Sequence, residues 1–402
     1  MADRLRSSTE RDPPADQAWR PPPQASQKTL ARVHSEHQYR AGLILRADAP
    51  GREPLSRIWP LVAVTAAFTA AAAVAHFTDA TPLLTFGLAT VALAGLAWIV
   101  SFSTERVGQH YGPAVTGVLQ STLGNLPEFF IVLFALSAGE LVVAKTSILG
   151  SIFANALLVL GIVILAGCHA SLEGVMRFHT RLPKDNAVLV LLTSFLIVLI
   201  GLSAATEDNA SHHIEAISIV GAIALLLTYG VWLNDYLRSD LPSIAVEGAP
   251  HVSMRLALAL LAAAGVGAAF VSDWFVTALT PAMKEIGLSQ AFAGIVVVGI
   301  AGNAVENTTG IVLALKGEAD LAISVVKNSV AQITAFLFPA LVLVSLLFST
   351  HLTFNLGPVY IGALALTAVA LWQITADGEA TRFEGVALIA FYVIVAVLAF
   401  YE

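Results

Sequence analysis

The chain has 402 residues, of which 57% are hydrophobic and only 12% are charged, and its mean hydropathy is +0.78. An ordinary soluble chain carries about 25% charged residues, so this one has too few polar groups to cover a surface that faces water. A net charge of -7 excludes a nucleic-acid-binding protein, and the single cysteine, Cys168, excludes a disulfide framework. The composition therefore predicts an all-α polytopic membrane protein that is surrounded by the lipid bilayer.

The first 57 residues differ in composition from the rest of the chain. They hold ten of the 21 Lys and Arg residues, together with seven acidic residues and seven prolines. Because such a segment is too polar to form a core, we expect a disordered cytosolic tail over 1–57. The first apolar run begins near Ile58, which is too far along the chain for a secretory signal peptide.

Eleven apolar runs follow the tail, and each is long enough to cross about 30 Å of hydrocarbon. They cover 58–77, 82–103, 111–136, 146–167, 185–205, 214–234, 254–276, 287–315, 320–349, 357–374 and 383–401. The third, eighth and ninth runs are long and contain polar residues, so we expect tilted or broken helices there.

Positive residues are distributed unevenly between alternate loops. The loops on the side of the tail hold Arg106, Arg177, Arg181, Lys184, Arg238, Arg255, Lys316 and Arg382. The loops on the opposite side hold only Lys145 and Lys284. Since Lys and Arg are enriched in cytosolic loops, this pattern predicts a cytosolic N-terminus and an external C-terminus.

A short motif occurs twice, at matching places in the third and eighth runs. It reads GNLPE at 124–128 and GNAVE at 302–306, and a polar pair follows in the next run of each half, Ser151 with Asn155 and Ser329 with Gln332. The duplication predicts an extra N-terminal helix at 58–77 and two five-helix repeats, 82–234 and 254–401. Because five is odd, the second repeat is inverted in the membrane, which is typical of secondary transporters with a binding site at the repeat interface.

The paired motifs place two carboxylates, Glu128 and Glu306, in the middle of apolar runs. A carboxylate in hydrocarbon costs several kcal/mol, so we expect these two to face one another at the membrane centre and to be used. Gly124 and Gly302 lower helix stability and are expected to open the backbone. Further oxygen atoms come from Asn125, Asn303, Asn155, Gln332, Ser151, Ser329 and Thr122.

Two carboxylates with neutral oxygen ligands suit Ca2+, which takes six to eight oxygen ligands, better than Zn2+ or copper, which favour nitrogen and sulfur. Glu128 and Glu306 are the predicted metal ligands. When the ion leaves, repulsion between the carboxylates favours their protonation, so ion and proton compete for one site. This predicts exchange of Ca2+ and H+ as substrates, with no cofactor.

Other interpretations of the polar residues remain open. Each Asn, Ser or Gln taken singly could only hold helices together. We expect Lys327, near the start of the ninth run, to extend to the cytosolic interface. His212 and His213, with their acidic neighbours, form either a solvated external loop or a weak cation-collecting mouth.

The motifs resemble those of the calcium/cation:proton exchanger (CAX) family of the cation/Ca2+ antiporter superfamily. The resemblance covers nearly all of 58–402 and is most specific in GNLPEFFIVLFAL, SILGSIFANALLVLG and GNAVENTTGIVLALKGEADLAISVVKNSVAQ. It implies eleven helices, Glu128 and Glu306 as central ligands for cation and proton, and alternating access driven by a proton gradient.

The chain departs from the family at two positions. Asn307 stands where the family usually has His, which puts a proton or selectivity role of that residue in doubt, and Asn328 stands where it usually has Gly. The acidic segment between the halves is reduced to three acids within 235–253. This reduction favours a compact prokaryotic member in a bacterial inner membrane.

The sequence therefore predicts a Ca2+/H+ antiporter that exports Ca2+ from the cytosol, and it leaves homo-oligomer formation open. An exchanger for Mn2+ or Na+, or a Na+-coupled Ca2+ exchanger, is the alternative. An intramembrane metal-dependent hydrolase would need His ligands, and none of the ten His residues lies beside either glutamate, so we expect no enzyme. A passive channel fits an inverted repeat less well than alternating access.

Overall fold

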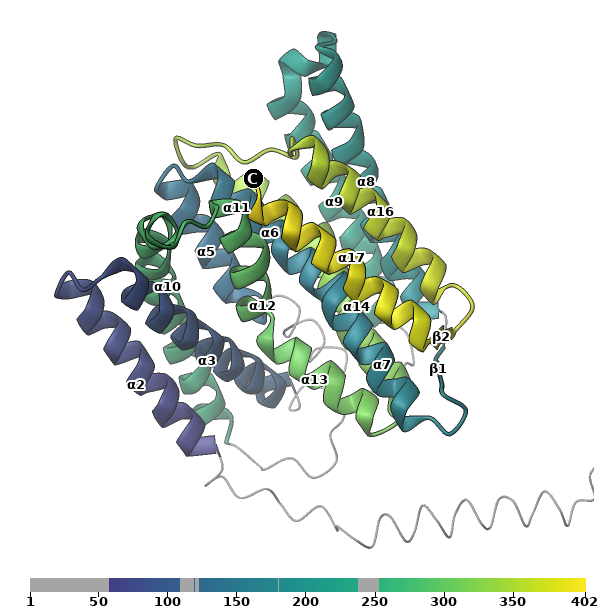
Figure 1. Ribbon diagram of the computed structural model, residues 1–402, viewed down its shortest axis with the longest axis horizontal. Coiled ribbons are helices and arrows are strands. Elements are labelled where there is room, and N and C mark those ends of the chain that lie inside the picture. The colour runs from purple at the N-terminus through teal and green to yellow at the C-terminus, as the bar shows by residue number, and fades with distance from the viewer. Residues whose placement is uncertain (1–57, 109–118, 120–122, 180, 238–252) are drawn as a thin grey trace, which may run out of the picture. The chain divides into compact units, whose positions relative to one another are not determined.

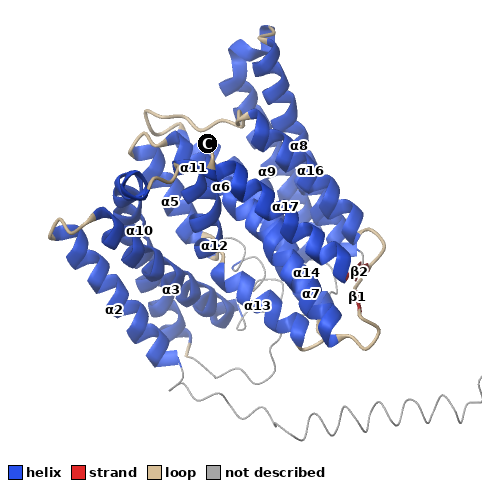
Figure 2. Ribbon diagram, viewed as in Figure 1, coloured by secondary structure: helices blue, strands red, loops and turns tan. Residues whose placement is uncertain are grey.

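The computed structural model describes residues 58–108, 119, 123–179, 181–237 and 253–402, all within one compact unit. The predicted tail, 1–57, lies outside the described residues. Figure 2 shows that the described chain is almost entirely helical, with two short strands.

The helices follow one another along the whole described chain. The first half contains α2 (Ile58–Phe77), α3 (Pro82–Gly108), α5 (Leu126–Ser137), α6 (Leu141–Phe153), η2 (Ala154–Val159), α7 (Leu160–Ala170), α8 (Arg181–Thr206), η3 (Asn209–His213) and α9 (Ile214–Leu237). The second half contains α10 (Met254–Ile286), α11 (Gln290–Phe292), η4 (Ala293–Val298), α12 (Gly299–Gly302), α13 (Ala304–Leu315), α14 (Ala319–Gln332), η5 (Ile333–Leu337), α15 (Phe338–Ser345), α16 (Pro358–Thr375) and α17 (Arg382–Phe400).

Among the described residues, nine helices are long and apolar enough to cross a membrane. The two predicted spans without such a helix are 111–136, of which much lies outside the described residues, and 287–315, which is divided into α11, η4, α12 and α13. The other predicted spans coincide with helices to within a few residues at most ends. The largest difference is at α10, which continues ten residues beyond the predicted end at 276.

The same glycine turn ends α5 and α13. Gly139 and Gly317 follow these helices with φ angles of +76° and +82°, in the left-handed region where an L side chain is strained. Glu140 and Glu318 come next as the N-cap residues of α6 and α14. As a result α6 already begins at Leu141, so Lys145 lies inside a helix and not in the loop that the hydropathy of the segment indicates.

Two short strands are an exception to the predicted all-helical class. β1 (Val175–Arg177) and β2 (Glu379–Thr381) pair antiparallel, with Met176 opposite Ala380. The Sγ atom of Cys168, at the end of α7, donates a hydrogen bond of 3.3 Å to the carbonyl oxygen of Ala380. The loop after α7 and the loop after α16 therefore lie on the same side of the molecule.

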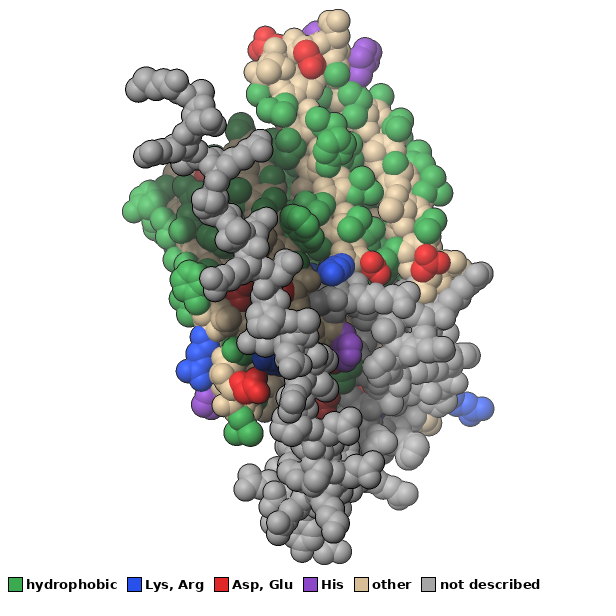
Figure 3. All heavy atoms as spheres, turned by 90° about the vertical axis from the view of Figure 1, so that its right-hand side faces the viewer, with side chains coloured by type: hydrophobic (Ala, Val, Ile, Leu, Met, Phe, Trp, Pro, Cys, Tyr) green, Lys and Arg blue, Asp and Glu red, His purple; other side chains and the backbone are tan. Residues whose placement is uncertain are grey.

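The helices pack around a core in which the motif-bearing elements are central. Figure 1 shows α2 at one flank beside α3 and α10, and α8, α9 and α16 at the other, with α5, α6 and α12 between them. Figure 3 shows that hydrophobic side chains cover the face made by α8, α9 and α16, where Phe195, Leu227 and Leu366 are more than half exposed. An apolar exterior of this kind suits a bilayer.

Candidate cation-binding site

Both GN motifs place an asparagine directly before a helix. Asn125, with φ and ψ of -90° and 18°, directly precedes α5, and Asn303, with -99° and 15°, separates α12 from α13. Pro127 in the first turn of α5 suits a helix start, because a backbone N–H has no partner there. The start of each helix leaves backbone N–H groups without an intrahelical partner, close in the sequence to each glutamate.

The carboxylate of Glu128 lies against the second motif. Glu128 is 2% exposed, and a Cβ atom added to Gly302 would overlap its carboxylate oxygen and lie 3.0 Å from its Cδ atom. Only glycine at position 302 leaves room for the Glu128 side chain as it stands. The first half of the chain thus delivers its glutamate to the helix break of the second half.

A cluster of hydrogen-bonded polar side chains joins the two halves of the chain beside the second GN motif. Asn155 Nδ2 donates to Asn303 Oδ1 at 2.7 Å and to Ser329 Oγ at 3.0 Å. Asn303 Nδ2 in turn donates to the carbonyl oxygen of Gly299 at 2.9 Å. Asn155 and Asn303 are both 0% exposed, so these bonds replace water inside the protein.

Three π-helical segments surround the motifs. Asn155 lies in η2, Gln332 directly precedes η5, and η4 leads into α12 and Gly302. A π-helix has i→i+5 hydrogen bonds and therefore more residues in each turn than an α-helix, and it is frequent at functional sites. Here the wider turns occur where polar side chains must point inward from otherwise apolar helices.

Glycines allow the two halves to cross at backbone contact. A Cβ atom on Gly150 of α6 would lie 2.7 Å from Ile295 Cα, and one on Gly299 would lie 3.0 Å from Gly150 Cα. Backbone atoms cannot move aside as a flexible side chain can, so a larger residue at either position would separate α6 from η4 and α12. The glycines therefore hold Ser151 and Asn155 close to the second motif.

Several buried oxygen atoms in this region have no hydrogen-bond donor from another residue that the structure describes. They are both carboxylate oxygens of Glu128, Oδ1 of Asn155 and Oγ of Ser151. A buried acceptor without a partner is costly, and a bound cation or a proton on the carboxylate would remove that cost. The atoms are all oxygen, and no group of three or more His, Cys, Asp or Glu occurs in the described part of the chain. The chemistry suits a hard cation.

The structure brings together five of the residues that the sequence singles out: Glu128, Gly302, Asn155, Asn303 and Ser329. Four others are also buried: Gly124 and Asn125 directly before α5, Ser151 in α6 and Gln332 at the end of α14. Glu306 lies in α13, but its side chain is outside the described residues, as is that of Asn307, and Thr122 lies outside them altogether.

The expectation for Lys327 is wrong. This residue does not extend to an interface: it is 2% exposed, and its Nζ donates to Thr375 Oγ1 at 2.6 Å. The hydroxyl of Thr375 offers a partner inside the protein, which a sequence separation of 48 residues conceals. Asn186 was also missed; it is 1% exposed and donates to Asn328 Oδ1 at 2.7 Å. Lys327 and Asn186 are each a polar residue within a predicted apolar run, and this is the signal in the sequence that could have identified them as buried polar positions.

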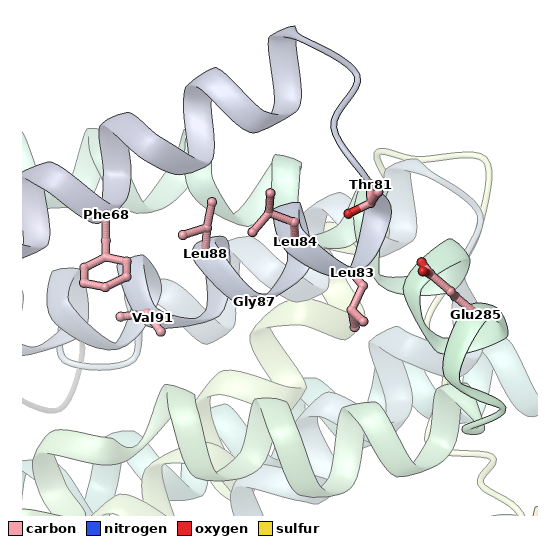
Figure 4. A pocket seen from close by; sticks show the side chains of 8 residues that line it. All are labelled: Phe68, Thr81, Leu83, Leu84, Gly87, Leu88, Val91 and Glu285. Carbon is pink, nitrogen blue, oxygen red and sulfur yellow. The ribbon is translucent and has the colours of Figure 1, made fainter.

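Two other features lie away from the motifs. A groove of about 480 Å3 between α2, α3 and the end of α10 is lined by apolar residues such as Phe68, Leu84 and Leu88, with Glu285 at one end (Figure 4). Gly87 opens its floor, and the shape and chemistry suit a surface that faces lipid.

The tip between α8 and α9 holds His212 and His213, which are exposed in η3 and belong to no group that could hold a metal among the described residues. The Ser203 hydroxyl beside Asp208, helped by the backbone N–H groups that Asp208 caps, lowers the pKa of this carboxyl below its usual range. The tip is therefore an exposed, capped turn.

The chain matches the model of one protein family, described as sodium/calcium exchanger protein, over residues 81–234 and 256–401. It is 30% identical over 341 residues to the vacuolar cation/proton exchanger 3 of Arabidopsis thaliana, covering 79% of this chain and 74% of the relative. It is 29% identical over 317 residues to the Ca2+/H+ antiporter ChaA of Bacillus subtilis (strain 168), covering 78% and 90%.

This chain is also similar in fold to a solved structure. The structure of native YfkE superposes with a TM-score of 0.72 at 26% identity, covering 85% of this chain and 100% of that one.

Proposed function

The chain belongs to the sodium/calcium exchanger protein family, in its calcium/cation:proton exchanger (CAX) branch, and we propose that it is an antiporter that exports Ca2+ from the cytosol in exchange for H+. The activity of this family is transport, and the relatives named above are a cation/proton exchanger and a Ca2+/H+ antiporter. The substrates proposed here are Ca2+ and H+, with no cofactor.

The observation that carries the proposal is that the two halves share one set of buried oxygen atoms. The Glu128 carboxylate reaches Gly302, and Asn155 of the first half bonds Asn303 and Ser329 of the second. A carboxylate inside a membrane is retained when it is used, and a site at the interface of two halves is accessible from alternate sides when the halves move.

The exchange follows from the charge of the site. We propose that Ca2+ is bound by the carboxylates of Glu128 and Glu306, with oxygen atoms from Asn125, Asn155, Asn303, Ser151, Ser329 and Gln332 completing its shell. When Ca2+ leaves on the external side, protons bind the carboxylates, and the neutral site returns to the cytosolic side. There the protons dissociate and the charge is restored for the next ion.

We propose eleven spans, with an extra N-terminal helix before two inverted five-helix repeats. The two spans beyond the nine long helices are 111–136, of which much lies outside the described residues, and 287–315, which is divided at Asn303 and so contains no single long helix. Corresponding elements keep their order and size: α5 and α13 have 12 residues each, and π-helices η2 and η5 follow α6 and α14.

Contacts between loops support the proposed sidedness. β1 pairs with β2, and the backbone N–H of His179 donates to Asp320 in the first turn of α14. These contacts join the loop after α7, the loop after α16 and the start of α14, all of which we assign to the cytosol. Glu215 bonds His351, and Lys145 bonds the carbonyl oxygen of Asn355, which joins elements assigned to the outside. We place the protein in a bacterial inner membrane with a cytosolic N-terminus.

Uptake of radioactive Ca2+ into everted membrane vesicles tests the function. Because the cytosolic face of an everted vesicle points outward, a vesicle whose interior is acidified should accumulate Ca2+, and an uncoupler should abolish the accumulation. Vesicles that carry Glu128→Gln are the matched control, because the variant keeps the size of the side chain and loses the charge.

Accumulation that persists with the uncoupler but requires a Na+ gradient would replace the proposal with Na+-coupled exchange. Accumulation of Mn2+ or Na+ in place of Ca2+ under the same gradient would replace the transported ion. Equal downhill flux with and without any gradient, at rates that do not saturate, would indicate a channel.

A further inference from the structure

A half-buried glutamate joins the two halves of the chain on the face that we assign to the outside. Glu140 is the N-cap residue of α6, but its side chain does not cap that helix. Its Oε1 atom accepts a hydrogen bond of 3.2 Å from the hydroxyl of Thr280 in α10, and its Oε2 atom accepts one of 3.1 Å from Nε2 of Gln290 in α11. Gln290 Nε2 also donates to Thr280 Oγ1 at 2.7 Å, so the three side chains form a closed ring, which we call the outer ring.

Both donors of the outer ring belong to the second half. Thr280 lies in the part of α10 that continues beyond its apolar run. Gln290 follows Ser289, whose hydroxyl donates to the carbonyl oxygen of Ala399 at the end of α17 at 2.6 Å. The ends of α10 and α17 and the start of α11 therefore form one frame, and the Glu140 side chain ties the start of α6 to it.

A row of polar residues on α6 leads from the outer ring towards the motifs. Ser147 lies about two helical turns after Glu140, and Ser151 lies about one turn after Ser147, so these positions share one face of the helix. Both serine side chains are 1% exposed, and their Oγ atoms have no hydrogen-bond partner among the described residues. A buried hydroxyl without a partner is costly, and hydration or an ion removes that cost. This face is therefore a polar path between the outside and Ser151, and the burial of both serines shows that it is closed in this arrangement.

The matching glutamate of the second half is placed differently. Glu318 follows Gly317 and precedes α14, as Glu140 follows Gly139 and precedes α6. Glu318 is nevertheless exposed, whereas Glu140 is half-buried between elements of the two halves. The shared turn therefore does not by itself account for the outer ring.

We propose that the outer ring is the external gate of this exchanger, which holds the start of α6 against the second half and must break before the site opens to the outside. This deepens the proposed function, on which its place in the transport cycle rests. Hydrogen bonds to a carboxylate are stronger than those between neutral groups, so the ring favours the closed arrangement. Water can replace both donors when α6 moves away, so the same carboxylate allows the gate to open.

The accessibility of position 147 tests the proposal. Ser147→Cys is introduced together with Cys168→Ala, which removes the one native cysteine, and the full chain in right-side-out vesicles is treated with an impermeant thiol reagent. With the ring intact, we expect labelling to be far slower than at the exposed tip residue His212→Cys. Gln290→Leu keeps the approximate size of the side chain and removes its N–H donors, so labelling should become about tenfold faster or more. Thr280→Val removes one hydroxyl and should accelerate labelling by about threefold or more.

Two controls separate the outer ring from other polar groups. Glu318→Gln changes the matching glutamate and should leave the rate of labelling within about twofold of the parent, because Glu318 takes no part in the ring. Ser203→Ala breaks a hydrogen bond to Asp208 that lies on the same external side but within the first half, and it should likewise have no effect. Glu140→Ala combined with Gln290→Leu should label no faster than the faster single variant, because both changes break the same bonds.

An unchanged rate in a folded Gln290→Leu variant overturns the proposal, as does an equal acceleration in either control. If Gln290→Leu does not fold, an unchanged rate in Thr280→Val overturns it. Rapid labelling of Ser147→Cys with the ring intact, or acceleration only in everted vesicles, also overturns it. Labelling requires no transported ion, so a failure of Ca2+/H+ exchange in the wild type would refute the proposed function and leave the labelling result to decide the role of the ring.

Discussion

Gly302→Ala tests the contact that unites the two halves of the chain. Gly302 is not among the described glycines with positive φ, so an alanine fits its backbone. The added Cβ atom would lie 3.0 Å from Cδ and 3.3 Å from Cγ of Glu128 and would overlap the carboxylate. The end of a flexible side chain can give way, so we expect the protein to fold and the carboxylate to move by about 1 Å.

The expected loss of function is large compared with the loss of stability. Overpacking in a core costs about 1–3 kcal/mol, and much less where the neighbour is a side-chain terminus that can turn. Misplacing a reacting group by about 1 Å can cost about a hundredfold in rate. We therefore expect the rate of Ca2+/H+ exchange to fall by about tenfold to a hundredfold, with little change in the melting temperature.

The assay is Ca2+-dependent proton movement in proteoliposomes, with thermal unfolding measured on the same preparations. Gly87→Ala is the matched control, because a Cβ atom at Gly87 of α3 would meet nothing within 4 Å. Exchange by Gly302→Ala at near the wild-type rate would refute the close contact of Glu128 with the second motif.

A double variant gives a sharper result. Glu128→Asp shortens the side chain by one methylene group, which makes room for the alanine. The effects of Gly302→Ala and Glu128→Asp should therefore be less than additive in a double-mutant cycle. Additive losses would mean that the two positions act independently, although the structure places them in contact.

Four further predictions use the same reconstituted system. Glu128→Gln should abolish Ca2+-dependent proton movement and Glu128→Asp should only weaken it, because an amide neither carries a proton nor balances a divalent charge; a fully active Gln variant would contradict this. Asn307→His should shift the pH dependence of exchange, since His changes charge between about pH 5 and 8; an identical profile would show that position 307 does not sense the proton. In intact cells, a cysteine at Glu173 should resist an impermeant thiol reagent and one at His212 should react, and the reverse pattern would refute the sidedness. The pKa of Asp208 is lowered in the folded protein, so its cap on η3 should persist at pH values above the usual pKa of 3.8 and be lost only as the pH falls through the lower, folded pKa. If the amide protons of Ala210 and Ser211 lose their protection from exchange already near neutral pH, this prediction is wrong.

The sequence predicts the helices well where hydrophobicity alone determines them. The bounds of α2 are those of the predicted run 58–77, and α9 begins at the predicted residue 214. Prediction is weaker where a backbone turn decides, as at Gly139, whose positive φ lets α6 begin at Leu141 and brings Lys145 into the helix. Hydropathy averages over such a turn and does not detect it.

The candidate site shows the same division. Duplication of the GNxxE motif identifies Glu128, Asn155 and Asn303 as residues of interest, because polar groups within apolar runs are costly and are seldom kept twice unless they are used. The partners of Lys327 and Asn328 could not be predicted, since Thr375 and Asn186 lie 48 and 142 residues away. The apolar runs contain many Thr and Asn residues, and the way in which the helices pack and rotate against one another determines which of them meets a given side chain.

The way in which each half completes the other bears on how binding and movement are coupled. The Glu128 carboxylate occupies space that only Gly302 leaves open, and the Asn155 amide is divided between Asn303 and Ser329. Any displacement of α5 or η2 relative to α12 and α14 must therefore change how these buried oxygen atoms are arranged. A cation that binds all of these oxygen atoms at once favours the arrangement in which they converge, and a proton, which needs only one carboxylate oxygen, has no such preference. This difference in preference is what an exchanger requires, because an ion can shift the equilibrium between two arrangements only by its differential affinity for them.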